Sequence, residues 1–223
     1  MNLFEKISKI DVDKYVKIVE EAMKNDILVQ NPEELGRWLA LITSLPFHKE
    51  LFTYMEIGVS AGGTMRLTRK ILLDLFDEVV CLAVDDGSDS AFMYFGQWLA
   101  THRASNVYLL RTDIEALRQD LKNIGSSTVF PISNKINACL IDAAHTFDLT
   151  REAFYSVEDL IAPDGIVSFH DTTDCRCPQV KEAVDSILVE HKDWKIIADF
   201  SAQFGFTVLG RKNAKFTITR RSS

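Results

Sequence analysis

The sequence predicts an α/β protein with a doubly wound, seven-stranded sheet, and two observations support this fold class. Apolar runs of strand length alternate with amphipathic stretches of helix length, which is typical of a parallel sheet covered by helices on both faces. The last two apolar runs are separated only by residues 201–203, a connection too short for a helical crossover, so we expect an antiparallel hairpin there. The expected sheet therefore has six parallel strands and one antiparallel strand.

The expected elements can be placed in chain order. Two helices, near residues 11–25 and 32–45, precede the sheet. For the second helix we expect Asn31 as the N-cap, Pro32 in the first turn and Glu34 completing a capping box. The strands are expected at residues 51–58, 79–85, 106–111, 136–142, 165–171, 194–200 and 204–211.

Residues 1–45 are expected to form a helical cap within the same domain as residues 46–223. A chain of 223 residues with 47% hydrophobic content is long enough for one sizeable core and marginal for two. The apolar stripes of the two helices, which include Val16 and Trp38, need a partner surface. That surface is either the ligand-binding side of the sheet or a second copy of the chain, which would make a homodimer.

Charge and hydropathy exclude several classes of partner. The net charge of -7 argues against nucleic acid or an anionic membrane as a partner, because both attract a basic surface. No apolar run is long enough to span a membrane and the first residues lack a cleavable apolar segment, so we expect a cytoplasmic protein. Cys81 and Cys139 lie in strand-like runs as reduced core residues, whereas Cys175 and Cys177 form a lone C-x-C that is unsuited to a structural zinc site.

Acids, histidines and one glycine stand at, or just after, the carboxyl ends of five of the expected strands. Ligands bind at the carboxyl ends of the strands in a doubly wound sheet, so these residues are candidates for the functional site. They are Glu56, Gly58, Asp85, Asp113, Asp142, His145, His170 and Asp171.

The stretch YMEIGVSAGGTMRLTRKIL, residues 54–72, indicates a cofactor site after the first strand. Glycines that follow a buried strand let the backbone approach a ligand, and the next helix presents its first N–H groups. The dinucleotide pattern G-x-G-x-x-G is absent because Ser60 replaces the middle glycine, and Asp85 lies farther away than a ribose contact to a nicotinamide cofactor requires. A carboxylate at Glu56, beside Gly58, would also repel a pyrophosphate.

The spacing E-x-G-x-x-x-G-x-T, which begins at Glu56, resembles motif I of the class I S-adenosylmethionine-dependent methyltransferases, which have a Rossmann-like fold. The resemblance covers about residues 50–210 and implies S-adenosylmethionine as the cofactor. It implies that Asp85 binds the ribose hydroxyls and that Asp113 faces the adenine, although Asp113 is equally suited to cap the following helix. The implied cofactor-binding residues are Glu56, Gly58, Ser60, Gly62, Thr64, Asp85, Asp113 and Asp142.

A second stretch, LIDAAHTFDLTREAFYSVEDLIAPDGIVSFHD, is similar to the branch that contains small-molecule and sugar O-methyltransferases and proteins labelled cephalosporin hydroxylases. This resemblance implies methyl transfer to a hydroxyl of a small acceptor such as a sugar or natural product. Metal-dependent members bind magnesium through acids at the positions of Asp142, His170 and Asp171. Because His170 replaces one acid, manganese or iron is an alternative to magnesium. His145 is the first candidate for the catalytic base and His170 the second.

Two other functions fit the same residues. One is a cofactor-binding or assembly protein that keeps the fold although its acceptor site has decayed or been repurposed. Independently of that function, Asp142, His145, His170 and Asp171 could form only a hydrogen-bonded polar network at the end of the sheet. The other is a metal-dependent oxidoreductase or hydrolase. Binding of S-adenosylmethionine without turnover would favour the first, and bound iron or zinc with no affinity for the methyl donor would favour the second.

Overall fold

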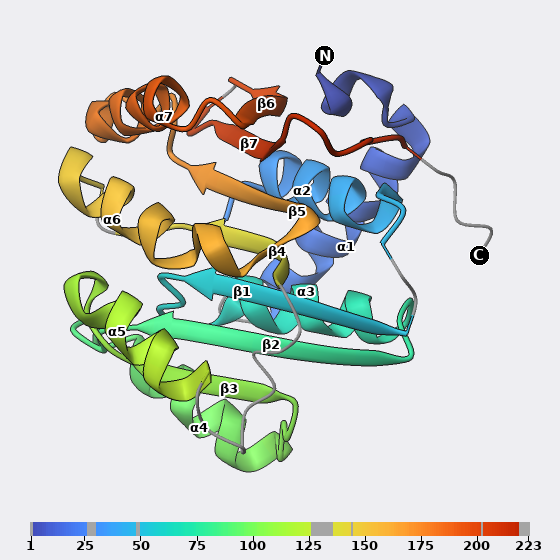
Figure 1. Ribbon diagram of the computed structural model, residues 1–223. Coiled ribbons are helices and arrows are strands. Elements are labelled where there is room, and N and C mark those ends of the chain that lie inside the picture. The colour runs from blue at the N-terminus through green and yellow to red at the C-terminus, as the bar shows by residue number, and fades with distance from the viewer. Residues whose placement is uncertain are drawn as a thin grey trace.

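The protein contains a single seven-stranded sheet in the order β3-β2-β1-β4-β5-β7-β6 (Figure 1). The computed structural model describes residues 2–25, 30–47, 50–125, 136–143, 145–201 and 203–218. The strands are β1 (Leu51–Ile57), β2 (Glu78–Asp85), β3 (Val107–Arg111), β4 (Ile136–Ile141), β5 (Ile161–His170), β6 (Trp194–Phe200) and β7 (Phe206–Arg211). Strands β3, β2, β1, β4 and β5 pair in parallel, and β7 is antiparallel to both β5 and β6. The predicted sheet of six parallel strands and one reversed strand is confirmed.

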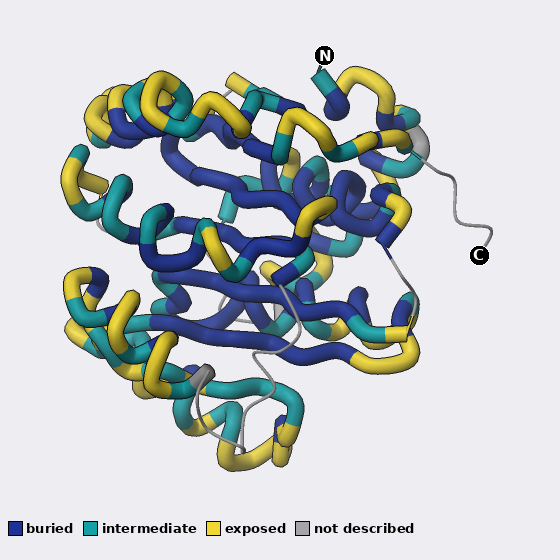
Figure 2. The backbone as a smooth tube through the Cα atoms, viewed as in Figure 1, coloured by how far each residue is buried: buried dark blue, intermediate teal, exposed yellow. Residues whose placement is uncertain are grey.

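Helices cover both faces of the sheet, so side chains along a strand point alternately into the hydrophobic cores on its two faces. One face is covered by α1 (Lys9–Asn25), α2 (Pro32–Ser44), α3 (Gly63–Leu73) and α4 (Phe92–His102), and the other by α5 (Ile114–Gly125), α6 (Phe147–Val157) and α7 (Pro178–Glu190). In β1, Phe52 and Tyr54 belong to the first buried cluster, whereas Met55 and Ile57 belong to the second. The central strands are consequently buried on both faces (Figure 2), as a parallel sheet requires.

Strand β5 begins at Ile161, four residues earlier than the sequence predicted. Its pairing with β4 shifts register between the pairs Ile136–Ile161 and Ala138–Ile166. This irregularity absorbs the extra residues that include Pro163, which has no N–H to donate to a neighbouring strand. The predicted strand was too short because a proline and a glycine in sequence indicate a turn, and here they form a bulge within the strand.

The amino-terminal helices pack against the sheet and share one hydrophobic cluster with it. The Asn31 side chain accepts hydrogen bonds from the N–H groups of Glu33 and Glu34, which confirms the predicted N-cap of α2. Trp38 stacks on Phe206 of β7, with 5.8 Å between ring centroids. The expected capping-box role of Glu34 is wrong, because this fully buried side chain instead accepts the N–H of Gly205, just before β7, and lies 3.4 Å from His170 at the end of β5.

Within the described ranges, none of the helices combines the length and apolar character needed to cross a bilayer. Cys81 and Cys139 are buried, free cysteines in β2 and β4, as predicted.

Candidate active site

The turn after β1 requires glycine at two positions because other elements approach it closely. Gly58 has a φ of +90° and donates its N–H to the Val84 carbonyl at 2.9 Å, and a Cβ on it would collide with the carbonyl oxygen of Asp142. Gly62, the N-cap of α3, has a φ of +78°, and a Cβ on it would collide with the ring of Phe95. A substitution of Gly58 would therefore disturb the packing of β1 against β4. A loss of cofactor binding in such a variant could not be distinguished from this structural damage.

Two adjoining cavities open along this turn, at the carboxyl ends of β1, β2 and β4. The larger has a volume of about 440 Å³ and the smaller about 180 Å³. Both are lined by Gly58, Ser60 and Asp142, so the two cavities flank the same turn. A third cavity of about 670 Å³ lies among the amino-terminal helices, away from the strand ends, and none of the predicted site residues lines it. Size alone therefore does not identify the site.

Asp85 and Ser60 join the end of β2 to the turn. The Asp85 carboxylate accepts the N–H of Ser60 and the N–H of Gly87, each at 2.8 Å. Ser60, at a φ of +46°, donates its hydroxyl to Asp89 at 2.7 Å. Asp85 and Ser60 both line the larger cavity, where the resemblance predicted the ribose. Because two N–H groups fix the Asp85 carboxylate, its remaining lone pairs can accept hydroxyl protons from a ligand.

Glu56 is a carboxylate buried beneath the same turn, with 2% of its surface exposed. Its Oε2 accepts the hydroxyl proton of Tyr54 at 2.9 Å. Burial raises the pKa of Glu56 well above its usual value; the Tyr54 hydrogen bond opposes this shift, and the charges of Asp142 and Asp85 add to it. Glu56 and the buried Thr64 line the smaller cavity. A cation in this cavity would be attracted by a carboxylate that has few other partners.

Asp113 has the capping role that the sequence left open. Its Oδ1 accepts the N–H of Ala116 at 2.8 Å, so it caps the first turn of α5. Asp113 also lines the larger cavity. Capping and a contact to a ligand are therefore compatible at this position.

The ends of β4 and β5 bring together the four residues predicted as metal ligands or catalytic bases, because these strands are neighbours in the sheet. Nδ1 of His170 lies 3.2 Å from Oδ1 of Asp142 and 3.3 Å from Oδ1 of Asp171. Nε2 of His145 lies 2.7 Å from Oδ2 of Asp171 and 4.0 Å from Oδ1 of Asp142. Asp171 follows β5 with a φ of +60°, an uncommon backbone conformation for a residue other than glycine. The chain thus turns sharply where the carboxylate must reach both imidazoles.

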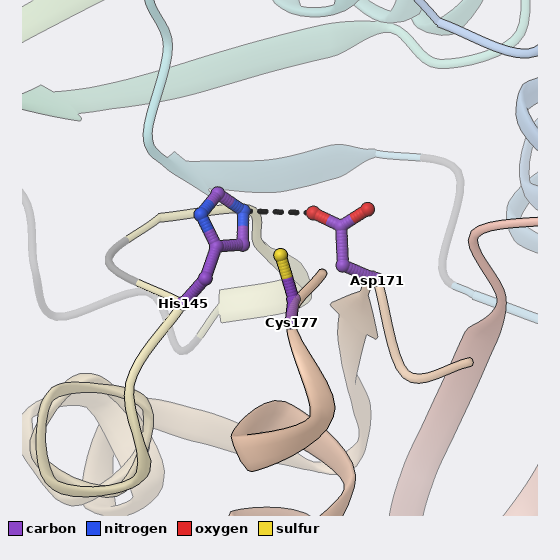
Figure 3. Close-up of side chains that lie close together, drawn as sticks. All are labelled: His145, Asp171 and Cys177. Atoms are coloured by element: carbon purple, nitrogen blue, oxygen red, sulfur yellow. Dashed lines mark ion pairs between the residues drawn. The ribbon is translucent and has the colours of Figure 1, made fainter. Parts of the chain in front are cut away.

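His145 is the most accessible member of this cluster, with 45% of its side chain exposed, and it lines the larger cavity. Figure 3 shows its ring directed at Asp171, with the sulfur of Cys177 beside the pair. Among the described residues, no hydrogen bond is found to Nδ1 of His145. The ligand atoms of His145, Asp171 and Cys177 all lie within 4.8 Å of one another, a set that could also hold a soft metal ion.

Two contacts to the cluster come from the amino-terminal segment and were missed in the sequence. Gln30 donates its side-chain amide to Oδ2 of Asp142 at 2.7 Å. Glu34 accepts the N–H of Gly205 at 2.7 Å, and its Oε2 lies 3.4 Å from Nε2 of His170. The available signal was the spacing of Glu34 and Trp38, which puts an acid on the apolar face of α2.

The charges of the cluster stabilise one another. Burial alone would lower the pKa of His170, but hydrogen bonds with Asp142, Asp171 and Glu34 raise it to about 12. The carboxylates of Asp142, at 4.0 Å, and Asp171, at 2.7 Å, raise the pKa of His145 to about 9. Burial alone would raise the pKa of Asp142 and of Asp171, but the two histidines lower both. Without a bound cation, the imidazoliums therefore compensate the two aspartates at neutral pH.

The donor atoms of Asp142, His170 and Asp171 fit a divalent metal ion. They lie within 4.8 Å of one another, and the two distances from Nδ1 of His170 are 3.2 and 3.3 Å. Ligands on one ion with bonds of about 2.0–2.2 Å are spaced by roughly 3.0–3.5 Å, so these atoms need little movement to share an ion. One nitrogen and two carboxylates suit manganese, iron or zinc better than magnesium. Binding would displace the proton of Nδ1.

Comparison with known proteins agrees with this fold. No curated protein sequence matches the chain. A solved structure from Staphylococcus aureus assigned as a caffeoyl-CoA O-methyltransferase has a TM-score of 0.60 at 15% identity, with 88% of this chain and 91% of that chain covered. The S-adenosylhomocysteine-bound methyltransferase PaMTH1 of Podospora anserina has a TM-score of 0.59 at 14% identity, covering 91% and 88%. CalS11, a TDP-rhamnose 3'-O-methyltransferase of calicheamicin biosynthesis, has a TM-score of 0.55 at 13% identity, covering 90% and 94%. Such low identities establish the fold alone.

The reversed β7, the glycine turn after β1 and the acid after β2 define a Rossmann-like protein with a cofactor crevice across its strand ends. The sequence model of the family described as "Methyltransferase domain" matches residues 55–172, which is more than half of the chain. The chain belongs to this family and is a class I S-adenosylmethionine-dependent methyltransferase.

Proposed function

We propose that the protein methylates a hydroxyl group of a small acceptor, such as a sugar or a natural product. The observation that carries this proposal is the contact of 2.7 Å between Asp171 and His145 beside the cofactor crevice. A hydroxyl nucleophile must lose a proton on methylation, and a carboxylate-oriented imidazole is a typical acceptor for that proton. Two of the structural neighbours are described as O-methyltransferases, which agrees with this choice.

The chain offers a distinct group for each part of the cofactor. S-adenosylmethionine supplies a methyl group activated by its sulfonium charge. We assign Asp85 to the ribose hydroxyls and Asp113 to the adenine, because both line the larger cavity. Glu56 faces the positively charged end from the smaller cavity. Asp142, which lines both cavities, lies where the methyl group must meet the acceptor.

His145 accepts the hydroxyl proton at Nδ1, while Asp171 binds Nε2 and fixes the orientation of the ring. As the acceptor oxygen bonds to the methyl carbon, the carbon–sulfur electron pair returns to sulfur and the proton remains on His145. The imidazole is a base only in its neutral form. A cation bound by Asp142 and Asp171 would offset their charges and lower the pKa of His145 towards neutrality.

We propose that Asp142, His170 and Asp171 hold this cation, a divalent metal that would stabilise the developing alkoxide of the acceptor. His170 thus serves as a ligand in this proposal, which leaves His145, the first of the two candidate bases, to accept the proton.

Residues 46–223 form the methyltransferase domain, and residues 1–45 form a cap that contributes Gln30 and Glu34 to the acceptor side. We expect the protein to act in the cytoplasm, without nucleic acid or membrane as its partner.

Methyl transfer can be tested with purified protein, S-adenosylmethionine and a panel of sugars, phenols and hydroxylated natural products. Release of S-adenosylhomocysteine is measured after chelation and after addition of manganese, iron or magnesium. We expect turnover on a hydroxylated acceptor that falls on chelation and returns with metal. Binding of S-adenosylmethionine without turnover across the panel would favour a non-catalytic protein. Methylation of only amines or thiols would refute the preference for oxygen.

A further inference from the structure

Glu34 is a charged side chain with no exposed surface, located on α2 and far in sequence from the strand-end cluster. Burial of a carboxylate is costly unless hydrogen bonds compensate it. The two oxygens of Glu34 have different partners: Oε1 accepts the Gly205 N–H at 2.7 Å, and Oε2 lies 3.4 Å from Nε2 of His170. Glu34 lines neither cavity of the cofactor crevice. Its buried charge is therefore directed at His170 and at the turn before β7.

The ring of His170 is held between acids on opposite sides. Nε2 faces Glu34 of α2, whereas Nδ1 faces Asp142 and Asp171 at the ends of β4 and β5. An imidazole that binds a metal through one nitrogen usually donates the N–H of the other nitrogen to a carboxylate or carbonyl. That outer hydrogen bond fixes the tautomer and the orientation of the ring. The contacts of His170 have this arrangement, with Glu34 as the outer carboxylate.

We infer that Glu34 is a positioning residue for a divalent metal ion: it holds a proton on Nε2 of His170, so that the lone pair of Nδ1 points between Asp142 and Asp171. The inference rests on the metal of the proposed function. It makes α2 a functional part of the site, because the helix supplies the group that orients a ligand from β5. It also accounts for an acid on the buried face of a helix that otherwise packs through Leu35, Trp38 and Leu39.

The variant Glu34→Gln separates this role from simple packing. Glutamine has nearly the same shape, and its carbonyl oxygen can still accept the Gly205 N–H. Its NH₂ group would then face Nε2 of His170, where it can only donate. Nε2 must therefore lose its proton. The neutral ring then keeps the proton that it already carries on Nδ1, where this proton blocks the metal. We expect a correctly folded protein with a misdirected ligand.

Divalent metal affinity of the Glu34→Gln protein is the first measurement, by manganese titration with electron paramagnetic resonance or calorimetry. Loss of such an outer partner typically weakens metal binding by about 10- to 100-fold, which is the expected effect. Binding of S-adenosylmethionine should stay within about twofold of wild type, because Glu34 lines neither cavity. Thr43→Val is the matched control: Thr43 is buried on the same helix, and among the described residues its hydroxyl bonds only the carbonyls of Leu39 and Ala40 in α2. This control should change neither affinity.

The proton on His170 provides a readout that is independent of metal and of methyl transfer. Nitrogen-15 chemical shifts of the metal-free protein should show a proton on Nε2 in wild type and none on Nε2 in Glu34→Gln. In a His170→Asp background, Glu34→Gln should no longer weaken metal binding, since no imidazole remains to be oriented. Wild-type metal affinity in Glu34→Gln would overturn the inference, as would an equal loss of metal and S-adenosylmethionine binding. If no acceptor is methylated but these metal and proton effects appear, the proposed function fails and the role of Glu34 stands.

Discussion

Replacing Glu56 with glutamine should change cofactor affinity and stability in opposite directions. Glutamine preserves the volume of the side chain and can still accept the Tyr54 hydroxyl, which is 2.9 Å from Oε2 of Glu56. The change removes one buried negative charge from the smaller cavity. A charge-assisted interaction is worth about 1.5–3 kcal/mol, so S-adenosylmethionine should bind roughly 10- to 100-fold more weakly.

The ligand-free protein should instead become more stable at neutral pH. Burial raises the pKa of Glu56, which means that its charged form is disfavoured in the folded state. A raised carboxyl pKa lowers stability as pH increases from the ordinary value of 4.5 towards the folded-state value, because the folded state binds more protons in that window. Below pH 4.5 the carboxyl is protonated in both states and the gain should disappear. Each 1 kcal/mol regained should raise the melting temperature by about 2–4 °C for a domain of this size.

Calorimetric titration with S-adenosylmethionine and thermal melts at several pH values test both signs. The matched control is Glu182→Gln, which removes one charge from an exposed position of α7. This control should alter neither cofactor affinity nor stability. If Glu56→Gln binds the cofactor as tightly as wild type and melts at a lower temperature, the electrostatic reasoning is wrong. Equal stability gains at acid and neutral pH would show that the effect comes from packing and not from charge.

Three further substitutions probe the rest of the site. His145→Ala should lower the rate of methyl transfer by roughly 10²- to 10⁴-fold with little change in cofactor affinity, and a smaller loss would contradict its role as base. Asp85→Ala should weaken S-adenosylmethionine binding by about 1–3 kcal/mol in a titration, as loss of hydrogen bonds to hydroxyls predicts. Excess zinc should inhibit by binding His145, Asp171 and Cys177; Cys177→Ser should reduce that inhibition, whereas the exposed Cys175 should be replaceable without effect.

The strands, and which of them run parallel or antiparallel, were predictable from the sequence because the signals for both are local. Apolar runs of strand length predicted all seven strands. The connection of residues 201–203 is too short for a helical crossover, and it therefore predicted the hairpin between β6 and β7. The start of β5 was misplaced, since the bulge around Pro163 depends on the neighbouring strand and not on local sequence. Local patterns therefore define the existence of an element better than its limits.

The candidate site was predictable only where its residues follow strands directly. Asp85, Asp142 and Asp171 were placed correctly at one edge of the sheet because parallel strands end together. Glu34 and Gln30 were missed because their contacts with the cluster span more than a hundred residues of sequence. The position of Glu34, three residues after the N-cap Asn31, even favoured a capping role. In the structure the side chain is instead buried against His170.

The position of β7 between β5 and β6 has a consequence for biosynthesis. During synthesis the chain emerges from its amino terminus, so β5 has only β4 as a neighbour until residues 206–211 have left the ribosome. His170 pairs with Phe206 in the completed sheet, and Glu34 holds Gly205 just before it. The cofactor crevice at β1 and β2 can thus assemble early, whereas the acceptor side is completed by one of the last strands to be made. In a nascent chain stalled before β7, bound S-adenosylmethionine should be poorly protected from solvent. The unpaired, apolar edge of β5 should then be exposed to chaperones.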